Sequence, residues 1–359
     1  MREPVAGANS TQVRREHFGA MPSGEAVWRY VLRSPALEVH VMTLGAGLVA
    51  IHAPDRAGRW RNVVLGHATL EEYLRPGKAY FGVICGRYAN RLGGAAVDID
   101  GVCYPLSANE GGETTLHGGA HGFDAYLWQA AETPDGVELS LRSPHGDQGF
   151  PGNLDVSVAY TLRNATLTLR FRCTTDRPTV LNLTNHAYFN LAGESSGSVL
   201  DHLLQVYADL YVPVDERLLP TGELRNVTGT PFDFRKPRRV GKHLPGNSPE
   251  LRANRGYNHT FVLPRKEPNQ SGPATLLTDN TSGRVLRVHT TEPGVHLYTG
   301  GFLDGAHTGA GGLPYGPSAG ACLETQHFPD GPHHAAFPST LLRPGTVWTS
   351  ETSFEFGSG

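Results

Sequence analysis

Residues 154–171 read LDVSVAYTLRNATLTLRF, and apolar and polar side chains alternate through most of this stretch. Every second residue from Leu154 to Leu162 is apolar, and the same rhythm returns at 167–171. A period of two is typical of a strand with one buried face. The sequence Arg-Asn-Ala at 163–165 separates the two runs, so the segment predicts a β-hairpin.

The same pattern recurs along the chain. The turn dipeptide Asp100-Gly101 joins two short alternating runs into a second predicted hairpin. Further strands are predicted around Val39 and Val41, at Val137, Leu139 and Leu141, and around Val285 and Val288. Helical signals are limited to 70–74 and 201–204, and 265–273 is predicted to be a surface loop. We therefore expect residues 1–359 to form a single domain, a large, mostly antiparallel β-sandwich of the all-β class.

The composition narrows the possible partners. The 359 residues carry a formal net charge of −3, with no cluster of Lys and Arg, which argues against nucleic acid or an anionic membrane. The 44 Gly and 26 Pro suit many short strands and turns better than long helices.

Cysteine usage and the N-terminus predict a cytoplasmic protein. Cys85, Cys103, Cys173 and Cys322 form no C-x-x-C pair, so we expect buried, reduced thiols. Residues 1–18 contain no apolar run that resembles a signal peptide. No later stretch approaches the ~18 apolar residues that a membrane helix needs.

Two short motif matches suggest other enzyme classes but lack the required context. Residues 45–50 fit the dinucleotide pattern G-x-G-x-x-A, yet Pro54 follows where that site needs a long helix. Residues 193–197 fit the G-x-S-x-G pattern of serine hydrolases, but no strand–helix alternation surrounds them. We expect a strand in the first case and a polar loop in the second.

Histidine spacing gives a weak metal signal. His117 and His121 are four residues apart, which is a zinc-ligand spacing on a helix. The two glycines between them would cost such a helix about 1 kcal/mol each. His333 and His334 form a bare pair, and no H-E-x-x-H motif is present. We therefore expect no catalytic metal.

Residues 181–191 read LNLTNHAYFNL and combine three Asn, a Thr and a His with two aromatic residues. A core strand would rarely carry so many amides, because each buried amide needs partners. The mixture suits a sugar pocket, in which aromatic faces contact C–H groups and amides bind hydroxyls. These residue types also fit a hydrogen-bonded turn with a structural histidine.

From 182 to 191 this segment resembles the signature of the aldose 1-epimerases, the galactose mutarotases, at every position. Other blocks resemble those of the family in the same order along nearly the whole chain: GRYANRL at 86–92, LHGG at 116–119, PTG at 220–222, PFDFR at 231–235, YTG at 298–300, FLD at 302–304 and ETQHFPD at 324–330. The resemblance implies a galactose mutarotase-like supersandwich with an open cleft. It also implies interconversion of the α and β anomers of a free aldose, such as galactose, glucose or a related hexose or pentose.

The resemblance assigns roles to matching positions. His186 would be the general acid and Glu324 the general base, while Arg91 and His117 would hold the sugar and Asn90 would line the cleft. The alternatives are a salt-bridged surface carboxylate for Glu324 and a structural ion pair for Arg91. The resemblance also implies that no metal or organic cofactor is needed and that the fold works as a monomer, so we expect a monomer or a weak dimer.

The acid–base pair fits the chemistry of mutarotation. Ring opening requires that the C1 hydroxyl lose a proton while the ring oxygen gains one. A carboxylate with an ordinary pKa can take the first proton, and an imidazolium can give the second. We expect each charged group to favour the charged form of the other, and turnover to show a bell-shaped dependence on pH.

Two positions depart from the family pattern, and both concern the grip on the sugar. Asn258 stands where the family usually has Asp, and His296 stands where it usually has Gln. An amide oxygen can still accept a hydrogen bond, but a charge-assisted bond, roughly twice as strong, is lost. We predict retained chemistry with an altered or relaxed sugar preference.

Three other functions remain as alternatives. A hexose-phosphate 1-epimerase would need extra cations in the cleft, and Arg235, Arg238 and Arg239 lie close together in sequence. A non-catalytic sugar-binding module would have no need for a matched acid and base. A glycoside hydrolase would use paired carboxylates, and only Glu324 has a convincing context.

Overall fold

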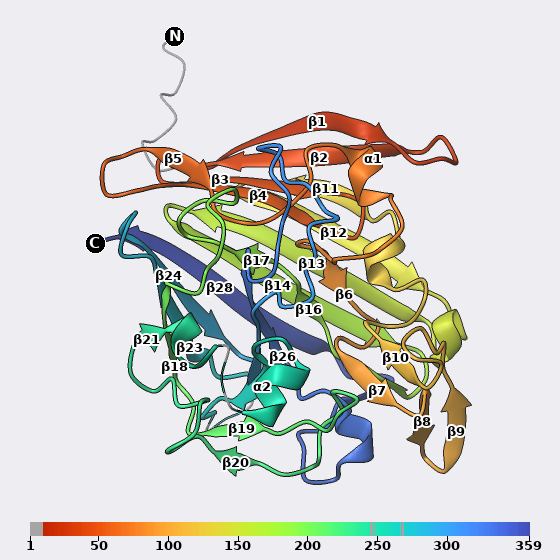
Figure 1. Ribbon diagram of the computed structural model, residues 1–359. Coiled ribbons are helices and arrows are strands. Elements are labelled where there is room, and N and C mark those ends of the chain that lie inside the picture. The colour runs from red at the N-terminus through yellow and green to blue at the C-terminus, as the bar shows by residue number, and fades with distance from the viewer. Residues whose placement is uncertain (1–9, 245, 247, 266, 268) are drawn as a thin grey trace.

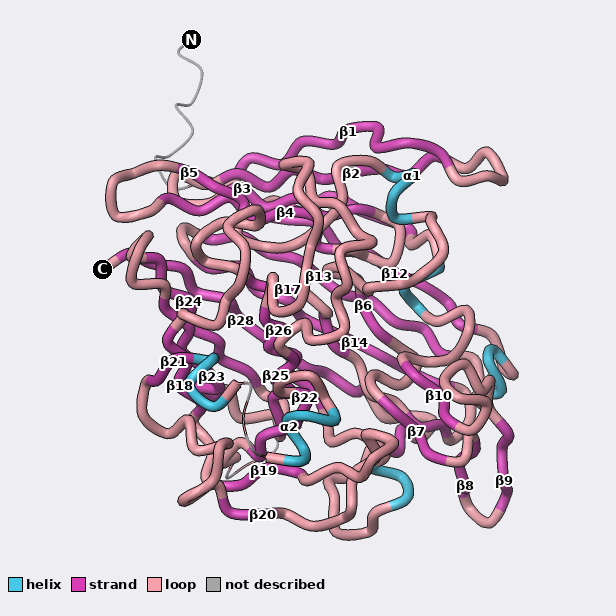
Figure 2. The backbone as a smooth tube through the Cα atoms, viewed as in Figure 1, coloured by secondary structure: helices cyan, strands magenta, loops and turns pink. Residues whose placement is uncertain are grey.

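The structure is a computed structural model that describes residues 10–244, 246, 248–265, 267 and 269–359 (Figure 1). Positions 1–9, and positions 266 and 268 of the predicted surface loop, lie outside the described residues. Strands make up most of the regular secondary structure (Figure 2), and every pairing between the named strands is antiparallel in the part of the chain that is described. The α-helices of this part are α1 (Leu70–Tyr73) and α2 (Pro249–Ala253), and its 3-10 turns are Phe123–Ala125, Asp147–Gly149, Val240–His243 and Gly331–His333. The predicted all-β class is therefore confirmed.

The predicted hairpin at 154–171 lies inside the largest sheet. The described residues give this sheet nine strands in the order β11 (Gln129–Thr133), β12 (Gly136–Ser143), β13 (Leu154–Arg163), β14 (Thr166–Thr175), β28 (Trp348–Ser358), β24 (Arg284–Thr290), β23 (Gly272–Thr278), β18 (Leu203–Val206) and β21 (Arg238–Arg239). Asn164, at φ 51°, supplies the left-handed backbone that the two-residue turn between β13 and β14 requires. The apolar row of β13 is buried, as its alternation predicts.

A five-stranded meander forms a second layer, at the top of the view in Figure 1. Its strands are β1 (Gln12–Ala20), β2 (Ala26–Arg33), β3 (Glu38–Met42), β4 (Leu48–Pro54) and β5 (Trp60–Asn62). Val39 and Ile51 from this layer join Val158 from the nine-stranded sheet in one buried apolar cluster. Burial of such side chains contributes roughly 1.5–3 kcal/mol each, so the cluster holds the layers together.

A six-stranded sheet completes the core and carries much of the site. Its order is β17 (Tyr188–Phe189), β26 (Ala321–Gln326), β25 (Gly294–Tyr298), β22 (Asn258–Val262), β19 (Leu210–Val212) and β20 (Arg225–Asn226). Smaller pairs join β16 (Thr184–Asn185) to β6 (Ile84–Cys85), β10 (Thr114–Leu116) to β7 (Arg91–Gly93), β8 (Ala96–Ile99) to β9 (Val102–Pro105), and β15 (Thr179–Val180) to β27 (Leu341–Leu342). Phe261, Val295 and Leu323 of the six-stranded sheet belong to the same core cluster as the other two layers.

Some local expectations are wrong. Residues 201–204 were expected to be helical, but Leu203–Val206 is strand β18, with Leu204 and Val206 buried in alternation. The predicted loop 265–273 ends earlier, because β23 begins at Gly272. Three cysteines are buried as expected, but Cys103 is exposed, because it lies on the solvent side of the β8–β9 hairpin.

Both motif matches have the structures expected of them. Residues 45–50 run into strand β4, and 193–197 form turns and coil. Within the described residues, the helices are too short to cross a membrane.

Candidate active site

A hollow of about 570 Å³ opens over the polar face of the six-stranded sheet. All seven site residues predicted from the sequence line it: Asn90, Arg91, His117, His186, Asn258, His296 and Glu324. Each of them is buried. The fold therefore gathers residues from distant parts of the chain around one pocket.

The alternation of the strands explains how this sheet serves both core and pocket. On β25 and β26, His296 lies directly opposite Glu324, and Thr260 of β22 lies opposite His296 from the other side. Their neighbours along the strands, Leu297 and Leu323, point to the apolar core. Successive side chains on a strand face opposite sides, so one sheet has an apolar face and a chemically active one.

His186 lies in the short link between β16 and β17, and the backbone fixes it on both sides. Its N–H donates to the carbonyl of Val83 at 2.9 Å, and its carbonyl accepts from Gly82 N–H at 3.0 Å. The imidazole Nδ1 is 3.6 Å from Cys322 Sγ. Nε2 faces Glu324 Oε1 at 3.7 Å, which is too long for a direct hydrogen bond.

Glu324 presents one oxygen that the protein leaves unbonded. Its side chain is 2% exposed, and Oε2 is buried with no hydrogen-bond partner among the described residues. Burial raises the pKa of Glu324 to about 8, against the attraction of the Arg91 guanidinium, which lowers it. A buried acceptor without a partner is costly, so this atom is suited to a ligand hydroxyl.

Burial lowers the pKa of His186 to about 4, so the pair holds a single proton between about pH 4 and pH 8. In the unliganded protein that proton resides on Glu324. The expectation of an ordinary carboxylate beside an imidazolium is therefore wrong. Loss of hydration penalises both charged forms more than their attraction at 3.7 Å favours them.

Arg91 combines the two roles that the sequence left open. It lines the pocket, and its Nε and one terminal nitrogen donate to the two oxygens of Glu110, each at 2.7 Å. Such a forked pair fixes the planar guanidinium in one orientation. The structural ion pair therefore holds Arg91 in place at the pocket wall.

Four non-glycine residues of the pocket wall have left-handed backbone conformations. They are Tyr80 at φ 57°, Asn90 at φ 63°, His117 at φ 50° and Leu218 at φ 63°. Strain of this kind clusters at functional sites, because it persists only where the surroundings enforce it. His117 Nδ1 accepts from the backbone N–H of Asn90 at 3.2 Å, so the neutral imidazole carries its proton on Nε2.

Asn258 and His296, the two residues that depart from the family pattern, contact each other. His296 Nε2 donates to Asn258 Oδ1 at 2.7 Å, and His296 Nδ1 accepts from the hydroxyl of Thr260 at 2.9 Å. Burial first, then nearby positive charge, holds the pKa of His296 well below its usual range, so the ring is neutral. His296 therefore takes one of the two acceptor positions of the Asn258 oxygen, and the other position can still accept a hydrogen bond from a sugar hydroxyl.

Sequence reasoning missed several wall residues, among them Tyr80, Tyr188, Tyr298 and Phe302. Tyr188 sits inside the 181–191 segment, and Tyr298 and Phe302 open two of the matching blocks, so those signals were available. Tyr80 comes from a loop whose sequence carries no comparable signal. Its ring lies 4.6 Å from that of His117 and 5.8 Å from that of His186, between centroids.

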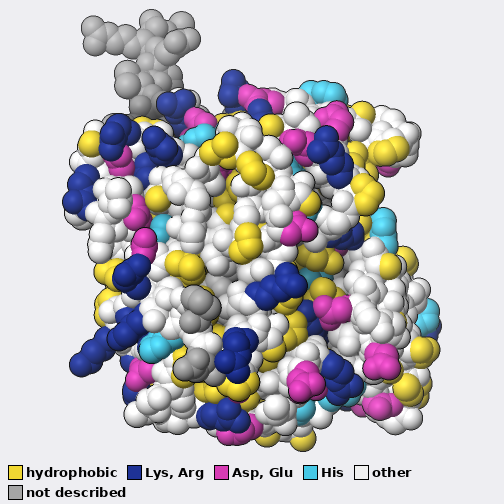
Figure 3. All heavy atoms as spheres, viewed as in Figure 1, with side chains coloured by type: hydrophobic (Ala, Val, Ile, Leu, Met, Phe, Trp, Pro, Cys, Tyr) yellow, Lys and Arg dark blue, Asp and Glu magenta, His cyan; other side chains and the backbone are white. Residues whose placement is uncertain are grey.

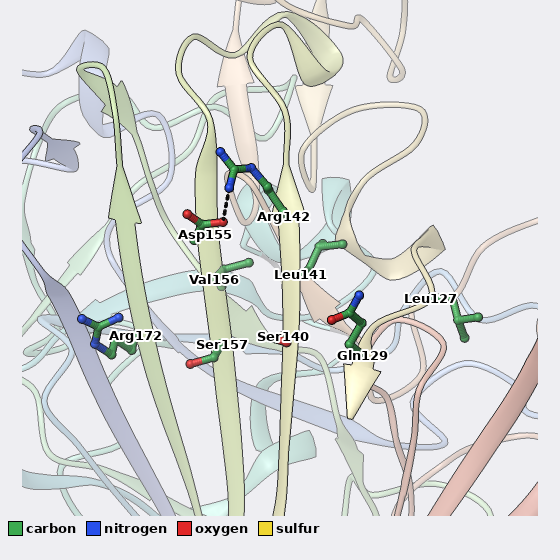
Figure 4. A pocket seen from close by; sticks show the side chains of 9 residues that line it. All are labelled: Leu127, Gln129, Ser140, Leu141, Arg142, Asp155, Val156, Ser157 and Arg172. Carbon is green, nitrogen blue, oxygen red and sulfur yellow. Dashed lines mark ion pairs between the residues drawn. The ribbon is translucent and has the colours of Figure 1, made fainter. Parts of the chain in front are cut away.

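Another hollow, of about 440 Å³, lies on the outer face of the nine-stranded sheet (Figure 4). Arg142 and Asp155 form an ion pair there at 3.5 Å between neighbouring strands. Its lining residues include no histidine and no buried carboxylate, so it offers no acid–base chemistry.

The arginines that suggested a phosphate site lie elsewhere. Arg235 pairs with Asp233, Arg238 stacks on Phe234 and Arg239 pairs with Asp201, and none of the three lines the pocket. Basic and acidic side chains are interspersed over the face shown in Figure 3.

An antiparallel supersandwich with one carboxyl–imidazole pair in a pocket lined by amides and aromatic rings defines an enzyme that acts on sugars by proton transfer. The sequence comparisons identify its family. The family model for aldose 1-epimerase matches residues 29–355. The human galactose mutarotase is 44% identical over 345 residues, which cover 96% of this chain and 98% of the human protein.

Two more distant relatives support the same family assignment. The aldose 1-epimerase of Escherichia coli K12 is 37% identical over 340 residues, covering 93% of this chain and 96% of that protein. The crystal structure of galactose 1-epimerase from Lactobacillus acidophilus NCFM superposes with a TM-score of 0.84 at 28% identity, covering 98% and 100% of the two chains. The chain belongs to the aldose 1-epimerase family and is an isomerase, which confirms the predicted fold, family and enzyme class.

Proposed function

We propose that this protein interconverts the α and β anomers of free aldoses, with Glu324 as the base and His186 as the acid in the sugar complex. One observation carries the assignment: Glu324 Oε2 is an unbonded acceptor, and His186 Nε2 stands 3.7 Å from the other oxygen. The anomeric hydroxyl and the ring oxygen are both attached to C1. An acid and a base that serve these two oxygens must both reach the same C1 centre, and the separation of 3.7 Å allows this.

The proposed proton transfers need no external reagent, because both catalytic groups return to their starting states. The C1 hydroxyl binds at Glu324 Oε2, and the proton of the pair passes to His186 as sugar hydroxyls replace the lost hydration of the carboxylate. Glu324 then takes the hydroxyl proton, His186 protonates the ring oxygen, and the bond between C1 and the ring oxygen breaks. Rotation about C1–C2 and the reverse steps give the other anomer.

The shifted pKa values support this sequence of steps. After ring opening Glu324 is protonated and His186 is neutral. This is the state that burial favours in the free protein. The site therefore stabilises the open-chain intermediate relative to the charged pair that precedes it.

We also propose an altered or relaxed sugar preference. Because His296 takes one acceptor position of its oxygen, Asn258 offers the sugar one neutral acceptor position and its NH₂ donors. An aspartate there would accept a hydrogen bond from a hydroxyl. We therefore expect the protein to turn over other free sugars, such as glucose, xylose or arabinose, in addition to galactose.

Polarimetry of freshly dissolved anomers tests both proposals. The protein should speed the relaxation of α-D-glucose and α-D-galactose beyond the spontaneous rate. No acceleration with any free aldose would refute the activity, and competition by glucose 6-phosphate would then favour a phosphorylated substrate. Acceleration confined to galactose would leave the activity standing and refute the relaxed preference.

We propose further that residues 1–359 form one domain that works in the cytoplasm as a monomer or weak dimer. Strand β28, near the C-terminus, pairs between β14 and β24 inside the largest sheet, which supports one domain. The four free thiols suit a reducing compartment. Sedimentation analysis tests the assembly state.

A further inference from the structure

Outside the sugar pocket, two histidines and a glutamate meet on the face of the five-stranded sheet that points away from the core. Glu38 and His40 lie two residues apart on β3, and His52 of β4 is directly opposite Glu38. The period of two puts all three side chains on the same face, while Val39 and Ile51 between them are fully buried in the core. The cluster is thus a product of strand register.

The three side chains converge. His40 Nε2 is 3.0 Å from Glu38 Oε1, and one ligand atom from each of the three residues lies within 4.8 Å of the others. The rings of His40 and His52 are 5.4 Å apart between centroids. Ligands at about 2.1 Å from one zinc ion stand at most about 4.2 Å apart, so a modest rotation of the side chains closes the site.

We propose that Glu38, His40 and His52 bind a divalent transition-metal ion of the zinc type. Two imidazoles and one carboxylate suit Zn²⁺, Ni²⁺ or Co²⁺, whereas Mg²⁺ and Ca²⁺ prefer oxygen ligands alone. Binding of the ion at His40 Nε2 displaces the hydrogen bond that this nitrogen makes with Glu38 Oε1.

The surroundings set the geometry of this site. Arg33 holds the second carboxylate oxygen of Glu38 at 3.2 Å, which leaves Oε1 for the metal. His40 and His52 line a hollow of about 520 Å³, which leaves room for water at the remaining coordination positions. Glu194, which also lines this hollow, is already bonded to Tyr315 and the backbone of Gly311. The ion would therefore tie β3 to β4 and keep an open coordination position.

The test titrates the full chain, without a histidine tag and after chelator treatment, with Zn²⁺ by calorimetry and with Co²⁺ by visible absorption. One equivalent should bind, and Zn²⁺ should raise the Tm. His40→Ala and His52→Ala should each weaken binding by about tenfold or more and abolish the rise in Tm. His289→Ala, which removes a half-buried strand histidine outside the cluster, should bind as the wild type does.

Two controls keep the outcomes distinct. Mutarotase turnover of the His40→Ala and His52→Ala variants should match that of the wild type, which shows that they fold. His186, Cys322 and Glu324 also converge in the sugar pocket and could compete for the ion. Binding that survives both histidine variants but disappears in Cys322→Ser would overturn the proposal, as would no binding of either metal.

Discussion

Replacement of Glu324 by glutamine removes the proposed base with almost no change in shape. A correctly placed acid or base contributes typically ~10²–10⁴ in rate, so kcat should fall by about that factor, equivalent to about 3–5 kcal/mol of transition-state stabilisation. The assay is polarimetry of fresh α-D-glucose or α-D-galactose, with the spontaneous rate subtracted. A loss of less than about tenfold in a folded variant would refute the role of Glu324.

The same substitution should stabilise the fold. In the unfolded chain this carboxyl titrates near 4.5, and burial raises its pKa to about 8 in the folded protein. The folded state therefore binds more protons between these values, and its stability falls as the pH rises through this window. At pH 7 this group costs up to about 3 kcal/mol, a cost that glutamine does not incur.

The stability gain has its own measurement and control. The Tm of Glu324→Gln should exceed that of the wild type, and the difference should grow from pH 5 to pH 8. Glu292 provides a matched control, because it is another buried glutamate beside a histidine, with Oε2 at 2.7 Å from His327 Nδ1, outside the pocket. Glu292→Gln should retain turnover. If Glu324→Gln were no more stable than the wild type at pH 8, the carboxyl would not be desolvated as the structure indicates.

Three further predictions concern the pocket. Arg91→Lys cannot reproduce the forked pair with Glu110, so kcat/KM should fall by about 10- to 100-fold while the Tm changes little; unchanged kinetics would contradict a positioning role. Asn258→Asp alone should pair with a protonated His296, whereas Asn258→Asp combined with His296→Gln should lower the KM for galactose; an equal effect of the single variant would contradict the coupling. The profile of kcat/KM against pH should fall below about 4, as the pair gains a second proton, and above about 8, as it loses its only one. A profile without an alkaline limb would refute the one-proton pair.

The period-two signal predicted several of the strands whose buried rows are apolar, and it failed where buried rows are polar. The hairpin at 154–171 belongs to the first group. Strand β28 belongs to the second, because its buried positions include Ser350 and Thr352 as well as two phenylalanines. Thr352 is satisfied by hydroxyl contacts with Thr325 at 2.6 Å and Thr290 at 2.9 Å. Those partners come from other strands, so local sequence cannot reveal that this strand is central.

Part of the candidate site could likewise be predicted from the sequence, and part could not. Its seven residues were found through matching blocks, and no spacing rule links His186 to Glu324, because strand pairing alone brings them together. The contact between Asn258 and His296 was also invisible, since it depends on the register of β22 and β25. Residue type gave the chemical inventory of the pocket but could not show the loss of hydration that reverses the protonation of the pair.

That reversal connects the architecture of the sheet to its chemistry. Leu323, the residue before Glu324 on β26, packs into the common core, and the buried Glu324 carboxyl lines the pocket with one oxygen unbonded. The same burial that makes its ionisation costly also makes proton uptake from a sugar hydroxyl favourable. A solvated carboxylate with an ordinary pKa would be ionised more readily but would be a weaker base toward the C1 hydroxyl. The protein thus gives up fold stability at neutral pH, and the base strength gained by Glu324 is what ring opening requires.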